Sequence, residues 1–187
     1  MSEKTLSVYI KALRDIFLVE DEPAWAPPMR AKVAMRVAAK RQFVDPSIAA
    51  TVLSAVPDRL MKDFRAFGFL FESLCVRDMR VYCQPLGGEI RHYRDQTGLE
   101  IDMIVVLKDG RWGGVEVKLG AGQIDGAAEN LKRMREKIDF NRMGQPSFLM
   151  VLTATDMGYT RPDGVIVCPI GCLRLWTSSL ARGRGFW

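Results

Sequence analysis

The sequence has little histidine, no long apolar run and no closely spaced cysteine pair. Its 187 residues contain a single histidine, His92, and four cysteines, which are Cys75, Cys83, Cys168 and Cys172. The cysteines lie in apolar segments and are spaced too widely for a zinc site, which takes tight pairs of ligands. Uninterrupted apolar stretches such as 103–107 and 148–152 are far shorter than the roughly 20 residues that cross a bilayer. These absences argue against a zinc protein and against a membrane-spanning one.

Two sequence motifs are also missing. The N-terminus has no apolar segment followed by a small-residue cleavage site, as a secretory signal would. The phosphate-binding loop Gly-x-x-x-x-Gly-Lys-Ser/Thr does not occur anywhere in the chain. We therefore expect a cytoplasmic protein that does not itself hydrolyse ATP.

The composition is that of an ordinary globular domain with a small excess of positive charge. Hydrophobic residues make up 48% and charged residues 26%, and 27 basic against 22 acidic side chains give a net charge of +5. Basic residues favour a polyanionic ligand such as nucleic acid, whereas the carboxylates concentrated in residues 58–119 could hold a metal ion. An excess of this size is also common in proteins that bind no nucleic acid.

Hydrophobic periodicity and turn residues divide the chain near Pro57. Before it, the pattern predicts a helix, two short extended segments and a second helix, at 5–15, 17–20, 41–44 and 46–53. Asp45 followed by Pro46 is a typical start of the second helix, with the aspartate as N-cap. Prolines at 23, 27 and 28 exclude regular structure between the extended segments.

After Pro57 the pattern predicts an α/β domain. The expected order is a helix, three strands, a helix and two strands, at 59–82, 89–94, 99–107, 111–118, 120–140, 148–153 and 164–168. Residues 95–98 and 108–110 have the composition of hairpin turns, so the first three strands should be antiparallel. The helix that follows makes a crossover, which places the next strand parallel in the same sheet.

Two neighbouring strands of this pattern carry carboxylates. Alternation of side chains puts Glu100 and Asp102 on one face of one strand, and Glu116 and Lys118 on one face of the next. In a hairpin Asp102 and Glu116 would be cross-strand neighbours, where like charges repel unless a cation lies between them. Such oxygen ligands suit Mg²⁺ or Mn²⁺. The alternative is an ordinary solvated strand face.

With Glu72 on the preceding helix, these residues resemble the PD-(D/E)XK nuclease superfamily, which has a restriction-endonuclease-like α-β-β-β-α-β core. The resemblance implies that Asp102, Glu116 and Glu72 hold or support Mg²⁺ or Mn²⁺. It also implies that Lys118 positions and activates the attacking water. Ile101 stands where the strict motif has proline.

A second resemblance covers nearly the whole chain. It rests on eight blocks in order: Thr5-Leu6-x-x-Tyr9, Phe17-Leu18-Val19, Pro23-Ala24-Trp25, Phe43-Val44-Asp45-Pro46, Phe71-Glu72-Ser73-Leu74, Tyr93-Arg94-Asp95, Leu99-Glu100-Ile101-Asp102 and Glu116-Val117-Lys118-Leu119-Gly120. They are similar to the uncharacterised domain at the C-terminus of many bacterial and archaeal AAA-type ATP-binding proteins. The resemblance implies a partial winged-helix subdomain at 1–57, a nuclease-like domain at 58–187, and an AAA-type ATPase module as partner in trans.

Two functions stay open on the sequence. One is a Mg²⁺-dependent nuclease that acts on DNA or RNA, and the other is a catalytically inert module of the same fold that binds nucleic acid or regulates an ATPase. The basic run 132–137 could contact phosphates or be a solvated helix face, and His92 could approach the phosphate or be structural. We expect three of the four tryptophans to pack in the interior rather than stack on bases, namely Trp25, Trp112 and Trp176.

Overall fold

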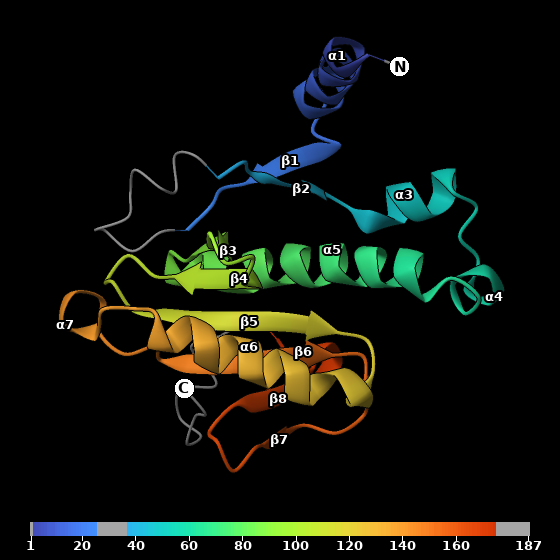
Figure 1. The fold of residues 1–187 in the computed structure, drawn as a ribbon. Helices are drawn as coiled ribbons and strands as arrows, with labels where there is room; N and C mark the ends of the chain where they lie inside the picture. The colour runs from blue at the N-terminus through green and yellow to red at the C-terminus, as the bar shows by residue number, and fades with distance from the viewer. Residues whose placement is uncertain (1, 26–36, 175–187) are drawn as a thin grey trace.

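The computed structural model describes residues 2–25 and 37–174 (Figure 1). The expectations for Pro27, Pro28 and Trp176 lie outside these residues. Within the described part of the chain, no helix is long and apolar enough to cross a membrane. The fold is a mixed α/β arrangement, as the sequence predicts.

A six-stranded mixed sheet forms the centre of the body, in the order β3-β4-β5-β6-β8-β7. Its strands are β3 (Glu89–Arg94), β4 (Glu100–Val106), β5 (Trp112–Lys118), β6 (Phe148–Thr153), β7 (Tyr159–Thr160) and β8 (Ile166–Pro169). β3, β4 and β5 are antiparallel, β6 is parallel to β5 and to β8, and β7 is antiparallel to β8. This confirms the predicted hairpins and the parallel crossover strand. β7 was not predicted, because two residues are too few to show a period.

One long helix packs on each face of this sheet. α5 (Phe64–Cys83) contributes Phe71, Cys75 and Val76 to one apolar cluster, and α6 (Ile124–Glu136) contributes Leu131 and Met134 to the other. In Figure 1 β5 is drawn between these two helices. The order α5, β3, β4, β5, α6, β6 is the predicted one. Its assignment to a restriction-endonuclease-like core stays a prediction.

The helices differ in extent from the prediction. The expected helix at 59–82 is two helices, α4 (Pro57–Leu60) and α5, because the Asp63 carboxylate accepts a hydrogen bond from the Ala66 N–H and starts α5 anew. The helix expected at 120–140 is shorter, because α6 begins at Ile124 and ends at Glu136. A separate short helix, α7 (Phe140–Met143), begins where the prediction ended, with Asp139 as its N-cap. The described residues also form short 3₁₀ turns, η2 (Gln84–Leu86), η3 (Ala121–Gln123) and η4 (Ile170–Cys172).

The described residues of the first 57 form a helix, a two-stranded ribbon and a second helix. These are α1 (Glu3–Asp15), β1 (Val19–Glu22), β2 (Lys40–Phe43) and α3 (Pro46–Val52), with β1 and β2 antiparallel. Asp45 is the N-cap of α3, as predicted, and accepts from the Ser47 N–H. The order of elements is confirmed, while the winged-helix assignment stays a prediction.

Trp25 attaches the end of the ribbon to the sheet. Its ring is buried between Tyr93 and Trp112, with ring centroids 6.1 Å and 5.1 Å away. The Trp25 N–H also donates to the His92 carbonyl oxygen at 2.6 Å. The expectation that Trp25 and Trp112 pack in the interior is therefore confirmed, and the ribbon lies against β3.

A β-bulge interrupts β4 at Asp102. Arg91 pairs with Ile104 and Tyr93 with Ile101, so one residue of β3 faces two residues of β4 at this point. An extra residue changes the side to which the following side chains point. Ile101 accordingly packs in the cluster under α6 and Met103 in the cluster under α5. The simple alternation predicted for this strand is therefore wrong at the bulge.

Candidate functional site

The bulge places the Asp102 carboxylate beside the end of β5. The regular β4–β5 pairing reaches Met103 and Val115. Beyond this pair, the Asp102 Oδ2 accepts a hydrogen bond from the Val117 N–H at 2.8 Å. The Asp102 carboxylate thus accepts a hydrogen bond that a backbone carbonyl of β4 would accept in a regular ladder. This bond fixes the carboxylate against the neighbouring strand.

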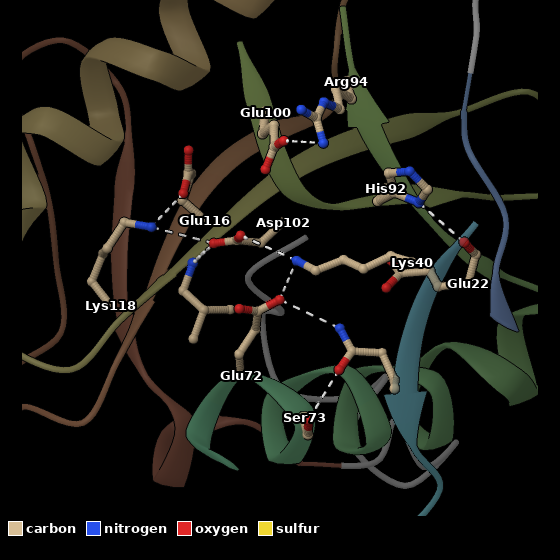
Figure 2. A network of polar contacts seen from close by, with 12 residues as sticks. Glu22, Lys40, Glu72, Ser73, His92, Arg94, Glu100, Asp102, Glu116 and Lys118 are labelled. Carbon is tan, nitrogen blue, oxygen red and sulfur yellow. Dashed lines mark hydrogen bonds and ion pairs between the residues drawn. The ribbon is translucent and has the colours of Figure 1, made fainter. Parts of the chain in front are cut away.

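Glu116 and Lys118 project from β5 toward Asp102 (Figure 2). The Lys118 Nζ donates to the Glu116 Oε2 at 2.6 Å and to the Asp102 Oδ2 at 3.3 Å. Glu116 is 2% exposed, and its other oxygen accepts from the Asn130 amide of α6 at 3.3 Å. The cross-strand proximity of the two acids that the sequence predicts is therefore present, with a lysine ammonium between them.

Glu72 comes from α5 and joins this group through Lys40 of the ribbon. The Lys40 Nζ contacts the Glu72 Oε1 and lies 3.7 Å from the Asp102 Oδ1. The Gln42 amide donates to the same Glu72 oxygen at 3.3 Å and accepts from the Ser73 hydroxyl at 2.9 Å. All four residues selected from the sequence thus belong to one network, in which carboxylates and ammonium groups alternate (Figure 2).

A fourth carboxylate lies beside this network. Glu22 of β1 pairs with Lys40 of β2 in the ribbon, and its side chain is fully buried. Neither of its carboxylate oxygens has a hydrogen-bond partner among residues 2–25 and 37–174. The Glu22 carbonyl oxygen lies 3.0 Å from the His92 Nδ1, so the histidine contacts the ribbon backbone.

The pKa values of these groups follow from burial and from the alternating charges. Burial and repulsion from Asp102 raise the pKa of Glu116 to about 8. Burial opposes ionisation of Asp102 as well, but the Lys118 and Lys40 ammonium groups hold the pKa of Asp102 below its ordinary value. Burial raises the pKa of Glu22 to about 7, although attraction to Lys40 lowers it. The cluster therefore has more carboxylates than its two lysines can neutralise.

The cluster opens to solvent at a pocket of about 420 Å³. Asp102, Glu116 and Lys118 line one side of this pocket, and Asn130 and Arg133 of α6 line another. Asp102, Glu116 and Lys118 are therefore reachable by a ligand, whereas Glu72 does not line this pocket. The positively charged side chain of Arg133 is also part of its lining.

The basic run of α6 is divided between two roles. Lys132 pairs with Glu129 and Asp163, and Lys137 pairs with Asp95, so both are neutralised by neighbours. Arg133, in contrast, is exposed and lines the pocket. In the sequence these basic residues form one run, whereas in the structure only Arg133 among them lines the pocket of the candidate site.

Sequence reasoning missed three residues of the network and the carboxylate beside it. Lys40 and Gln42 precede Glu72 by 32 and 30 positions, and nothing in their neighbourhood marks them as site residues. Asn130 carried a usable signal, because it follows Ala127 by one helical turn and so lies beside the buried face of α6. Glu22 is missed because a strand-edge glutamate ordinarily faces water.

The residues present have the donor chemistry of a Mg²⁺ or Mn²⁺ site, although they are not arranged as a complete one. No group of three or more His, Cys, Asp or Glu side chains in the described ranges is placed to hold a metal ion together. The Asp102 and Glu116 carboxylates do meet at the pocket, and the nearby Glu22 carboxylate is buried without a partner. Hard cations of this kind bind through one or two carboxylates and several waters. Asp102 and Glu116 are therefore the residues that would hold such an ion.

One family of known proteins matches this chain. A family model described as a domain of unknown function (DUF4143) matches residues 67–173, more than half of the 187 residues. No curated protein and no solved structure was found to match. The matched range includes Glu72, Asp102, Glu116 and Lys118. The resemblance to an uncharacterised domain is confirmed to that extent. The chain belongs to the family described as domain of unknown function DUF4143.

Proposed function

We propose that this protein is a Mg²⁺- or Mn²⁺-dependent nuclease of the PD-(D/E)XK type, which hydrolyses phosphodiester bonds in DNA or RNA. One observation carries the proposal: the Asp102 and Glu116 carboxylates share the Lys118 ammonium at the wall of an open pocket. The element order α5, β3, β4, β5, α6, β6 supports it, because that order is shared with a restriction-endonuclease-like core.

The four residues would divide the chemistry among them. Asp102 and Glu116 would hold the ion, with Glu72 as the supporting acid; when bound, such an ion polarises a phosphoryl oxygen and lowers the pKa of a water. Lys118 would orient the attacking water and stabilise the negative charge that develops on the phosphoryl oxygens. The position of the Lys118 Nζ between two acids keeps it protonated, because their attraction raises the pKa of Lys118 against the effect of burial.

Nucleic acid is the substrate class that the surface favours. The net charge of +5 attracts a polyanion, and Arg133 stands at the edge of the pocket that holds the acids. A phosphate contacted by Arg133 would lie beside the carboxylate cluster. Binding should weaken with salt, since phosphate contacts release counterions.

A second candidate function is a catalytically inert module of the same fold, which binds nucleic acid or regulates an AAA-type ATPase that acts in trans. The observation that favours it is the pairing of both lysines with carboxylates, which gives Glu72, Asp102 and Glu116 partners without any metal. In this reading the first 57 residues are the remnant of a winged helix that connects the module to its partner.

Cleavage assays separate the two candidates. Native protein, Lys118→Ala and Lys62→Ala are incubated with single- and double-stranded DNA and RNA in Mg²⁺ or Mn²⁺. Lys62 is exposed on the segment between α4 and α5, so it is a matched control for loss of a lysine. We expect cleavage by native protein and by Lys62→Ala, and a loss of at least about 100-fold in Lys118→Ala.

Two results would count against the nuclease. Native protein that cuts none of the four substrates, or that cuts no faster than Lys118→Ala, supports the inert module instead. Retained, salt-dependent binding of nucleic acid under those conditions would identify the inert module as a nucleic-acid-binding one.

A further inference from the structure

We propose that Lys40 is an internal cation that competes with a divalent metal ion for Asp102 and Glu72, and so sets the metal affinity of the carboxylate cluster. This inference rests on the proposed function, since it concerns the same cluster. It goes beyond the proposed function because it assigns a regulatory role to the ribbon, which precedes the nuclease-like body.

Several contacts hold the ribbon, and with it Lys40, in place. Lys40 pairs with Glu22 across the two strands, which places a cation next to a buried carboxylate without a hydrogen-bond partner in the described residues. Two residues further along β2, Gln42 bonds to both Glu72 and Ser73 of α5. At the other strand, the His92 N–H donates to the Pro23 carbonyl oxygen at 3.1 Å. The Lys40 ammonium is therefore delivered to the cluster by a docked element and not by a free loop.

The position of the Lys40 ammonium conflicts with that of a metal ion. Its Nζ contacts the Glu72 Oε1 and lies 3.7 Å from the Asp102 Oδ1. A Mg²⁺ ion held by Asp102 and Glu116, with Glu72 as the supporting acid, would need carboxylates that Lys40 now contacts. The two cations would then be close neighbours in a half-buried place, where like charges repel strongly. Occupation of Asp102 and Glu72 by a divalent ion therefore requires the ammonium to leave.

Lys40 also has space into which it can move. It lines a second pocket of about 590 Å³, together with His92, Arg94 and Glu100. Glu100 lines the first pocket as well, so the two hollows adjoin. The ammonium could turn from Asp102 toward the Glu100 side without a rearrangement of the sheet.

Lys118 differs from Lys40 in its origin, although its ammonium also contacts acids of the cluster and so also opposes a metal ion there. It stands on β5 two residues from Glu116 and contacts the other oxygen of Asp102, the Oδ2. Its position is fixed by the same strand that carries one of the acids. Lys40 alone comes from the ribbon, so only its removal leaves Asp102 and Glu72 facing each other without a cation between them.

Calorimetric titration with MnCl₂ tests the inference on the full chain. The variants are Lys40→Met, which keeps the length of the side chain, Lys40→Arg, which keeps the charge, and the exposed control Lys62→Met. We expect Lys40→Met to bind Mn²⁺ at least about tenfold more tightly than native protein. Lys40→Arg and Lys62→Met should bind like native protein. If Lys40→Met does not fold, the double variant Lys40→Met/Glu22→Gln serves the same comparison, because it also removes the buried carboxylate that Lys40 faces.

The outcomes distinguish this inference from the proposed function. Tighter binding in Lys40→Met supports competition, since a lysine with only a structural role would not weaken metal binding. Native protein that binds Mn²⁺ while Lys40→Met binds equally or less tightly overturns the inference and leaves the nuclease proposal standing. Absence of Mn²⁺ binding in native protein and in both Lys40→Met variants overturns the inference together with the metal site.

Discussion

Replacement of Glu22 by glutamine should make the protein more stable. The gain in stability should be larger at neutral and alkaline pH than at acidic pH. Glu22 is fully buried, and neither of its carboxylate oxygens has a hydrogen-bond partner in the described residues. Ionisation of such a group in the folded state is unfavourable. Glutamine has nearly the same shape and does not ionise, so Glu22→Gln removes this cost.

The size of the effect follows from the pKa of Glu22. Burial raises it from 4.5 to about 7 in the folded protein, so the folded state holds this proton more tightly than the unfolded chain does. The free energy of unfolding therefore falls as the pH rises from about 4.5 to about 7, and the loss is complete above about 7. A displacement of this size corresponds to about 3 kcal/mol at most. Below pH 4.5 the carboxyl is neutral in both states and contributes no such loss.

Urea unfolding between pH 5 and pH 8 measures this difference, with tryptophan fluorescence as the signal, to which the adjacent Trp25 and Trp112 contribute. The stability of Glu22→Gln relative to native protein should increase by about 2 to 3 kcal/mol across this range. Glu136→Gln on the exposed face of α6 is the control and should show no such trend. A difference between Glu22→Gln and native protein that is constant with pH, or that decreases toward pH 8, would refute the reasoning.

Two further predictions concern packing and use the same unfolding assay. Gly113→Ala should lower the free energy of unfolding by about 1–3 kcal/mol, because a Cβ at this position would lie 2.5 Å from the Phe148 ring. Gly126→Ala should instead raise the free energy of unfolding by about 0.5–1 kcal/mol, because Gly126 lies on the exposed side of α6 with open space around it. Trp25→Ala should cost about 3–5 kcal/mol, because its ring fills the space beside Trp112. Equal effects of the two glycine substitutions, or a Trp25→Ala protein as stable as the native one, would contradict these packing arguments.

Much of the fold follows from local patterns in the sequence. The strands that carry the acids are bounded by hairpin turns and filled with β-branched and apolar residues, so both their extent and their antiparallel pairing could be predicted. Helix boundaries were less predictable. Asp63 starts a new helix inside a stretch of continuous helical periodicity, and a single capping side chain does not alter that periodicity.

The candidate site was predictable only where its members are close in sequence. Asp102, Glu116 and Lys118 lie on adjacent strands of one hairpin, so strand pairing alone brings them together. The approach of Lys40 depends on how the ribbon docks against α5 and β3, and the bulge at Asp102 depends on the register of β3 against β4. No local pattern specifies either of them. The second cation of the cluster was therefore invisible in the sequence, although it alters what the cluster can bind.

The most direct test of the central claim is a calorimetric comparison of Mn²⁺ binding by native protein and by Asp102→Asn. Asparagine keeps a side-chain oxygen for the Val117 N–H but removes the negative charge, so the strand contact is conserved while the metal ligand is weakened. Circular dichroism and urea unfolding establish that the variant is folded. We predict a single Mn²⁺ site in native protein that is lost, or at least about 100-fold weaker, in Asp102→Asn. Equal affinity in the two proteins, or no Mn²⁺ binding by the native protein, would contradict the claim that this carboxylate cluster is a divalent cation site.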